Sequence, residues 1–190
     1  MGLRGHKTAA ASGGQTVRCL VALIGPTHVA FPAHWVRGII TPAEAGSGGR
    51  VTWANSSYER TDLAGRLTIG AQMVTAETRI ILYGNELRSR SFMVNGVLGL
   101  IDVERAQIQP LPSQFRGGER DRLLGLFSGT AYVALIANPF WVLELPPRKN
   151  ALDAFVFQAS ERRAGEFDSR LRLSSATHED AVPTPAGHET

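Results

Sequence analysis

The stretch LLGLFSGTAYVALIANPFWVL (residues 123–143) decides the fold class, because it carries no charged side chain and is about as long as a bilayer span. A Ser-Gly-Thr turn at residues 128–130 divides it into two short apolar runs. Two buried strands joined by a tight hairpin explain this pattern better than a membrane-spanning helix. Asn138 then precedes Pro139, a pair that favours the capped start of a short helix. We therefore expect a hairpin here and no insertion into a membrane.

Short apolar segments of the same kind continue upstream, and turn residues separate them. Residues 17–25 and 28–32 are predicted to form a first hairpin around a Gly-Pro-Thr turn. Residues 33–40 have the spacing of a short helix. Because strands do not alternate with long helices, the pattern favours an all-β fold with short helices, a sandwich or barrels. Further strands are predicted over residues 51–53, 58–61, 78–83, 88–94 and 97–103.

Three local signals refine this outline. Residues 54–56 form a predicted turn between two of the strands. Asp62 is predicted to cap a short helix over residues 63–67, because its carboxylate accepts hydrogen bonds from free backbone N–H groups. The Asn-Gly pair at residues 95–96 is the strongest short-range signal of a hairpin, and it marks either that turn or a bulge inside a longer ribbon.

The two ends of the chain differ in composition from its middle, which is expected to be one domain over residues 17–145. Residues 1–16 are rich in small residues and residues 174–190 hold few apolar ones, so both are expected to be disordered. Residues 146–173 are predicted to be a linker and a C-terminal helix, with Leu152, Phe155, Val156 and Ala159 at helical spacing. That helix either packs on the domain or serves as a detachable amphipathic element for a partner.

The charged residues do not form a basic patch. The formal net charge is +3, and the arginines are scattered along the chain. The tightest group, at residues 116–122, has Glu119 and Asp121 between its arginines, which favours a solvated loop. Nucleic-acid proteins usually concentrate positive charge on one face, so no nucleic-acid partner is expected. A basic β-barrel that binds RNA or an anionic surface is the alternative.

No pattern in the sequence predicts catalysis, a catalytic residue or a bound cofactor. His28 and His34 lack metal-ligand spacing and a cysteine partner, so no metal site is expected. Cys19, the single cysteine, lies in an apolar run and is predicted to be a buried core residue. Asp102 and Glu104 would share one face of a strand, but nothing implies an apolar pocket around them. We expect a protein that is not an enzyme; a site assembled from distant carboxylates is the enzymatic alternative.

The order of these segments resembles that of the CheW family of chemotaxis adaptors over about residues 17–145. The block GRVTWANSSYERTDL, residues 49–63, is similar to the family's central signature, in which two strands around a turn lead to an Asp-Leu pair that opens a helix. The block FMVNGVLGL, residues 92–100, resembles a later apolar strand of the family. Further matching stretches are residues 19–31, 35–39, 108–112 and 124–139.

This resemblance implies two small five-stranded SH3-like β-barrels that share a core. It also implies a non-enzymatic scaffold that couples chemoreceptor-like proteins to a CheA-type histidine kinase. The implied partners are the regulatory domain of the kinase and the cytoplasmic tip of the receptor. The implied location is the cytoplasm, with recruitment to membrane receptor arrays. The residues expected to bind partners are Val36, Arg37, Val51, Thr52, Trp53, Ala54 and Asn55.

The chain departs from the family signature at the turn that is expected to bind partners. Residues 52–55, Thr-Trp-Ala-Asn, stand where the family has Asn-Leu-Arg-Gly, so Ala54 replaces the signature arginine. Asn55 occupies the glycine position, and asparagine tolerates a positive φ. Trp53 is either a core residue or, if exposed, a replacement hot spot, because tryptophan is favoured at interface centres.

Overall fold

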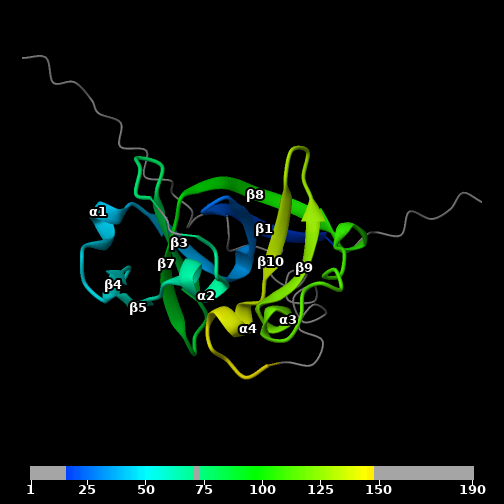
Figure 1. Cartoon of the computed structure of the whole chain (residues 1–190). Helices are drawn as coiled ribbons and strands as arrows, with labels where there is room; N and C mark the ends of the chain where they lie inside the picture. Colours follow the sequence, from blue (N-terminus) through cyan, green and yellow to red (C-terminus); the bar gives the residue numbers. More distant parts are fainter. Residues whose placement is uncertain (1–15, 71–72, 148–190) are drawn as a thin grey trace, which may run out of the picture.

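The computed structural model describes residues 16–70 and 73–147 (Figure 1). The described chain begins with the first strand at Thr16. The helix predicted within residues 146–173 and the tail at 174–190 lie outside the described residues, apart from residues 146 and 147.

Within the described residues, ten strands form two mixed five-stranded sheets, which we call the terminal sheet and the middle sheet. The terminal sheet has the order β8-β1-β2-β10-β9 and takes its strands from both ends of the described chain. It consists of β1 (Thr16–Ile24), β2 (Thr27–Pro32), β8 (Gly96–Glu104), β9 (Leu123–Ser128) and β10 (Val133–Ala137). The middle sheet has the order β3-β6-β7-β5-β4. It consists of β3 (Val36–Ile40), β4 (Arg50–Trp53), β5 (Ser56–Arg60), β6 (Arg79–Gly84) and β7 (Ser89–Val94).

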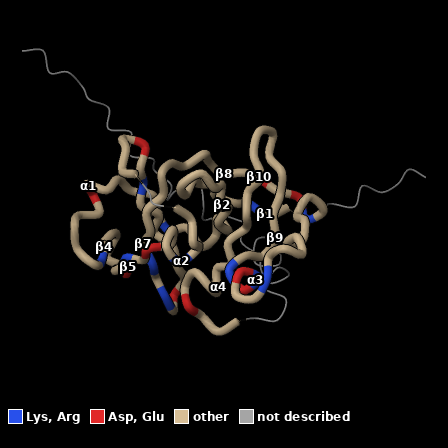
Figure 2. The backbone as a smooth tube through the Cα atoms, in the orientation of Figure 1, with Lys and Arg blue, Asp and Glu red and all other residues tan. Residues whose placement is uncertain are grey.

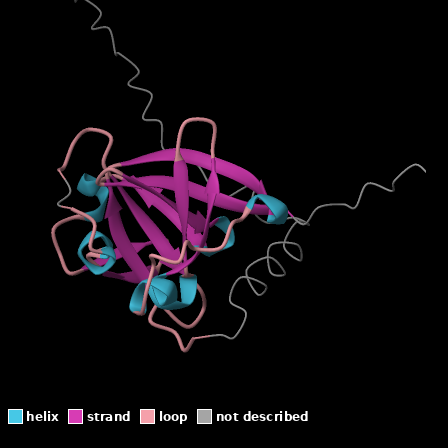
Figure 3. Ribbon diagram, turned by 45° about the vertical axis from the view of Figure 1, so that its right-hand side comes forward, coloured by secondary structure: helices cyan, strands magenta, loops and turns pink. Residues whose placement is uncertain are grey.

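Short helical segments connect the strands, and Figure 3 shows them around the periphery of the two sheets. They are η1 (Ala33–Trp35), α1 (Pro42–Ala45), α2 (Leu63–Leu67), η2 (Arg105–Gln107), α3 (Gly118–Arg122) and α4 (Pro139–Val142). Among the described residues, no helix has the length and apolar character needed to cross a membrane. The all-β class with short helices and the two five-stranded units are therefore confirmed.

Two helix starts follow directly from their capping side chains. The Asp62 carboxylate accepts a hydrogen bond from the Gly65 amide at 2.9 Å, and α2 begins at Leu63 as predicted. The Asn138 side chain accepts one from the Phe140 amide at 3.1 Å, and α4 begins at Pro139 as predicted. Each cap satisfies a backbone N–H that has no partner within the helix, an effect typically worth about 1 kcal/mol.

The middle sheet curls so that its two edge strands approach each other. A Cβ atom placed on Gly38 of β3 would lie 3.2 Å from the ring of Trp53 on β4, so the indole packs directly against this glycine. Val51, Tyr58, Ile80 and Leu82 fill the inside of the curl. Trp53 is half-buried and therefore contributes to the packing between the two edge strands.

A shared core joins the two sheets. Phe31 of β2 lies 5.0 Å from Phe92 of β7 and 5.8 Å from Tyr83 of β6, measured between ring centroids. These three side chains are fully buried, and Trp35 stacks on Tyr83 at 6.1 Å. Burial of one such side chain contributes about 1.5–3 kcal/mol, so the two sheets are stabilised by the same residues. The predicted shared core is confirmed.

The prediction of a helix over residues 33–40 is wrong beyond Trp35. Only a single 3-10 turn forms there, and β3 follows as an edge strand paired with β6. Burial alternates along β3, with Val36, Gly38 and Ile40 inside. An apolar stretch this short fits either period, and the available partner strand decides between them.

The Asn-Gly pair at residues 95–96 forms neither a hairpin nor a bulge, because it is the point where the chain passes from the middle sheet to the terminal sheet. β7 ends at Val94 in one sheet and β8 begins at Gly96 in the other. The Asn95 amide donates to the Leu23 carbonyl at 2.7 Å, and its side-chain oxygen accepts from the Gly25 amide at 2.7 Å. The residues predicted as a solvated loop around Arg120 form the exposed helix α3.

Candidate functional site

The β4–β5 hairpin carries most of the residues that the sequence assigns to partner binding. Trp53 pairs with Ser56, so Ala54 and Asn55 alone form the turn. Their φ angles are 47° and 62°, and positive φ at both central residues defines a type I′ turn. Asn55 adopts the left-handed conformation expected of it. Ala54 adopts it as well, at a cost of about 1–2 kcal/mol for a residue with a Cβ.

Changing the turn to Asn-Gly, by Ala54→Asn with Asn55→Gly, is expected to stabilise the protein. Both new residues accept a positive φ more readily than the residues they replace, so the free energy of unfolding should rise by about 1 kcal/mol. Urea denaturation measures it, with an unchanged m-value as the sign that only stability has moved. An unchanged or lower midpoint would contradict the assignment of strain to this turn.

The seven predicted binding residues divide into supporting and accessible ones. Val36 and Val51 are 5% and 1% exposed and belong to the cores, so their side chains shape the region without offering contact area. The accessible members form what we call the hairpin surface: Arg37, Thr52, Trp53, Ala54 and Asn55.

Arg37 of β3 lies beside the β4–β5 hairpin although it is distant from it in sequence. Its Nε donates to the Gly84 carbonyl at 2.9 Å, which fixes the side chain. Burial raises the pKa of Tyr58 on β5, while the nearby Arg37 guanidinium opposes that shift. The packing of Gly38, the residue after Arg37, against Trp53 places β3 next to the β4–β5 hairpin. Partner binding by these residues stays a prediction.

A second group of charged residues was missed at the sequence level. We call it the Glu144 cluster, and it consists of Glu59, Arg66, Arg88, Arg90 and Glu144. The Glu144 carboxylate accepts from Arg90 at 2.6 Å and lies 3.4 Å from Arg66 and 3.7 Å from Arg88. Arg90 also pairs with Glu59 at 2.7 Å. The one local signal was the Arg88-Ser-Arg90 alternation, which places both arginines on one face of a strand.

Glu144 occupies a backbone position that usually belongs to glycine. The Leu145 amide donates to the Phe140 carbonyl at 2.8 Å and the Glu144 amide to the Trp141 carbonyl at 3.1 Å, which is the Schellman ending of α4. Glu144 has φ 54° there. The conformation costs about 1–2 kcal/mol for a residue with a Cβ.

The titratable groups singled out for possible chemistry are engaged in structural roles. Burial raises the pKa of the Cys19 thiol to about 12, so the thiol stays protonated and is a poor nucleophile. Asp102 accepts two hydrogen bonds from the Arg18 guanidinium, at 2.9 and 3.1 Å, on the exposed side of β8. Within residues 16–70 and 73–147, no three His, Cys, Asp or Glu residues are grouped so as to hold a metal ion.

The charged residues of the described chain are dispersed over its surface. Figure 2 shows short blue and red segments spread along many elements, often side by side. In α3 the acidic residues Glu119 and Asp121 alternate with Arg120 and Arg122. This distribution agrees with the scattered arginines of the sequence.

A scan against protein-family models finds no match for this chain, and a search of curated proteins finds no relative. Among solved structures, the chain is similar to the scaffolding protein TtCheW from Thermoanaerobacter tengcongensis, with a TM-score of 0.52 and 15% sequence identity. The match covers 64% of this chain and 88% of that one. At this identity the likeness shows the fold, and it agrees with the CheW-like arrangement expected from the order of the segments.

Proposed function

We propose that this protein is a non-enzymatic scaffold that couples chemoreceptor-like proteins to a CheA-type histidine kinase. The observation that carries the proposal is the arrangement of the ten strands, which is similar to that of a protein described as a scaffolding protein. The order of sequence motifs, which resembles that of the CheW family, supports the same role. The proposed partners are the regulatory domain of the kinase and the cytoplasmic tip of the receptor, and the proposed location is the cytoplasm at receptor arrays.

The hairpin surface is the proposed contact site for one of these partners. Trp53 is half-buried against Gly38, so its ring is held in place before a partner arrives and loses little freedom on binding. Arg37 is held in the same way by the Gly84 carbonyl. Tryptophan and arginine are the residues most often found at energetic centres of interfaces. Thr52, Ala54 and Asn55 supply an exposed rim.

Replacing Trp53 by alanine is expected to weaken binding to the cognate kinase domain or receptor tip by about tenfold or more, the range of an interface hot spot. Isothermal titration of the full chain with each partner measures the effect. Because Trp53 also packs on Gly38, a second variant, Thr52→Arg, tests the same surface from an exposed position.

The matched control is Ser128→Arg, which adds the same side chain at the exposed end of β9. We expect the Ser128 variant to bind as tightly as the wild type. Equal effects of the two arginine substitutions would argue against the hairpin surface. A folded wild-type protein that binds neither partner would refute the scaffold itself, and salt-sensitive retention on RNA would favour the alternative function.

A further inference from the structure

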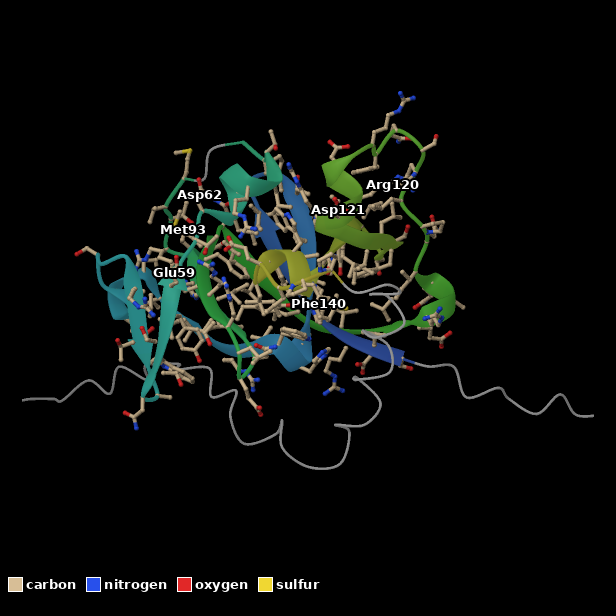
Figure 4. The ribbon with its side chains drawn as sticks, turned by 90° about the horizontal axis from the view of Figure 1, so that it is seen from below. Glu59, Asp62, Met93, Arg120, Asp121 and Phe140 are labelled. Carbon is tan, nitrogen blue, oxygen red and sulfur yellow. The ribbon has the colours of Figure 1, made fainter. Side chains whose placement is uncertain are left out.

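We propose that the Glu144 cluster is a second docking site, which takes an acidic side chain of a protein partner and which Glu144 fills in the free chain. Figure 4 shows the molecule from below, with Glu59 of β5 and Phe140 of α4 labelled. The proposal goes beyond the hairpin surface, and its test needs neither a receptor nor a kinase.

Two of the three arginines are fixed before any partner binds. The Arg90 side chain is only 8% exposed, and Glu59 holds it at 2.7 Å. Arg66 donates to the carbonyls of Trp141 and Val142 at 3.0 and 3.3 Å, and its guanidinium lies 4.3 Å from the centre of the Trp141 ring. Donors that are already immobilised lose little entropy when they bind an anion. Arg66 and Arg90 are therefore preorganised to bind a carboxylate.

The Glu144 carboxylate, which occupies the site in the free chain, is exposed enough for a partner's carboxylate to replace it. The Glu144 side chain is 48% exposed and makes one short contact, to Arg90, while Arg66 and Arg88 lie beyond 3 Å. Its backbone is in the left-handed conformation that favours glycine. A strained residue that keeps its side chain among three arginines points to a role for the carboxylate and not for the backbone.

Among the described residues, the Glu144 cluster holds more positive than negative charge. Three arginines face Glu59 and Glu144, and Arg122 lies 5.7 Å from the Trp141 ring centre. Burial lowers the pKa of Arg66, and the neighbouring Arg90 and Arg122 add to that shift while Glu144 opposes it. Asp62, the acidic residue next to α2, accepts a hydrogen bond from the Gly65 amide as the cap of that helix. A partner's carboxylate that took the place of Glu144 would keep this repulsion low.

A protein segment fits the site better than a free anion does. Trp141 of α4 is half-buried, and the guanidinium groups of Arg66 and Arg122 lie over its ring, so its accessible part adds apolar area next to the charged donors. Arginine beside tryptophan is typical of protein interfaces. Inorganic phosphate would use the guanidinium groups alone.

The test is a titration of the full chain with a tetraglutamate peptide, followed by NMR of the arginine Nε–Hε signals. The key variant is Glu144→Gly, which removes the competing carboxylate and suits the left-handed backbone. Its control is Glu77→Gln, which also removes one negative charge. Glu77 lies just before β6, at the open end of the β6–β7 hairpin where Arg79 pairs with Val94, whereas Arg88 and Arg90 lie near the turn at the other end. A third variant, Glu144→Gly with Arg88→Gln, removes an exposed arginine of the cluster.

We expect the Glu144 variant to bind the peptide about tenfold more tightly than the wild type, with shifts of the Arg66, Arg88 and Arg90 signals. The Glu77 variant should stay within twofold of the wild type, and the added Arg88 change should remove most of the gain. Equal gains in the Glu144 and Glu77 variants would overturn the proposal, because net charge alone would then explain them. Phosphate that binds as tightly as the peptide would overturn the assignment to a protein segment.

Discussion

Replacing Arg90 by alanine is expected to lower the free energy of unfolding by about 3 kcal/mol. The side chain is 8% exposed and pairs with both Glu59 and Glu144, so it links β5, β7 and the end of α4. Removing one partner of a buried ion pair typically costs 3–5 kcal/mol, because the opposite charge is left unpaired. The loss should fall at the lower end, since the two carboxylates are half-exposed and regain water. Urea denaturation followed by tryptophan fluorescence measures it.

Arg88→Ala is the matched control, because it removes the same charge from the same strand region. The Arg88 side chain is 49% exposed and lies 3.7 Å from Glu144, so this contact is a surface pair. Such pairs contribute about 0–1 kcal/mol. We expect the Arg88 variant to lose less than about 1 kcal/mol. Equal losses in the free energy of unfolding would mean that the contribution of Arg90 to stability does not come from its burial.

Replacing Phe92 by alanine is expected to cost about 3–5 kcal/mol and to weaken both sheets at once. Phe92 is fully buried on β7 and packs against Phe31 of the terminal sheet as well as Tyr83 of the middle sheet. A cavity at this point removes contacts from both sides. The variant should therefore still unfold in one transition at a lower urea concentration. Far-UV circular dichroism and tryptophan fluorescence should give the same midpoint.

The neighbouring change Met93→Ala separates this effect from a general weakening of β7. Met93 is only partly buried and packs against the interior of the curled middle sheet. We expect it to cost clearly less than Phe92→Ala, with coincident midpoints as well. Two separate transitions in either variant would show that the sheets unfold independently and that the shared core does not couple them.

The features that the sequence predicts correctly have their determinants within a few residues of one another. Asp62 and Asn138 cap their helices through amides two or three positions away. The turn at Ala54 and Asn55 depends on the conformations that its own two residues accept. The first hairpin and the β9–β10 hairpin likewise join neighbouring apolar runs across short turns.

The features that the sequence does not predict depend on segments far apart in the chain. β3 is a strand because β6 lies beside it, and the Asn95 side chain reaches Gly25 on another hairpin. At the candidate site, sequence reasoning placed Arg37 with the β4–β5 turn, but it gave no sign that Val36 and Val51 are buried. The Glu144 cluster combines α2, β5, β7 and the end of α4, a set that only the fold brings together.

The terminal sheet also has a consequence for how the protein is made. Its strand β2 pairs with β10 through His28 and Ala134, and β1 pairs with β8 through Arg18 and Asp102. At synthesis rates of about 5–20 residues per second, the first hairpin waits on the order of 10 s for its neighbours to be translated. During that interval the β1–β2 hairpin exposes unpaired edges on both sides, and such edges invite association with other chains. Because β8 and β10 cover these edges, the length of the nascent chain sets the earliest moment at which the hairpin can be protected from association.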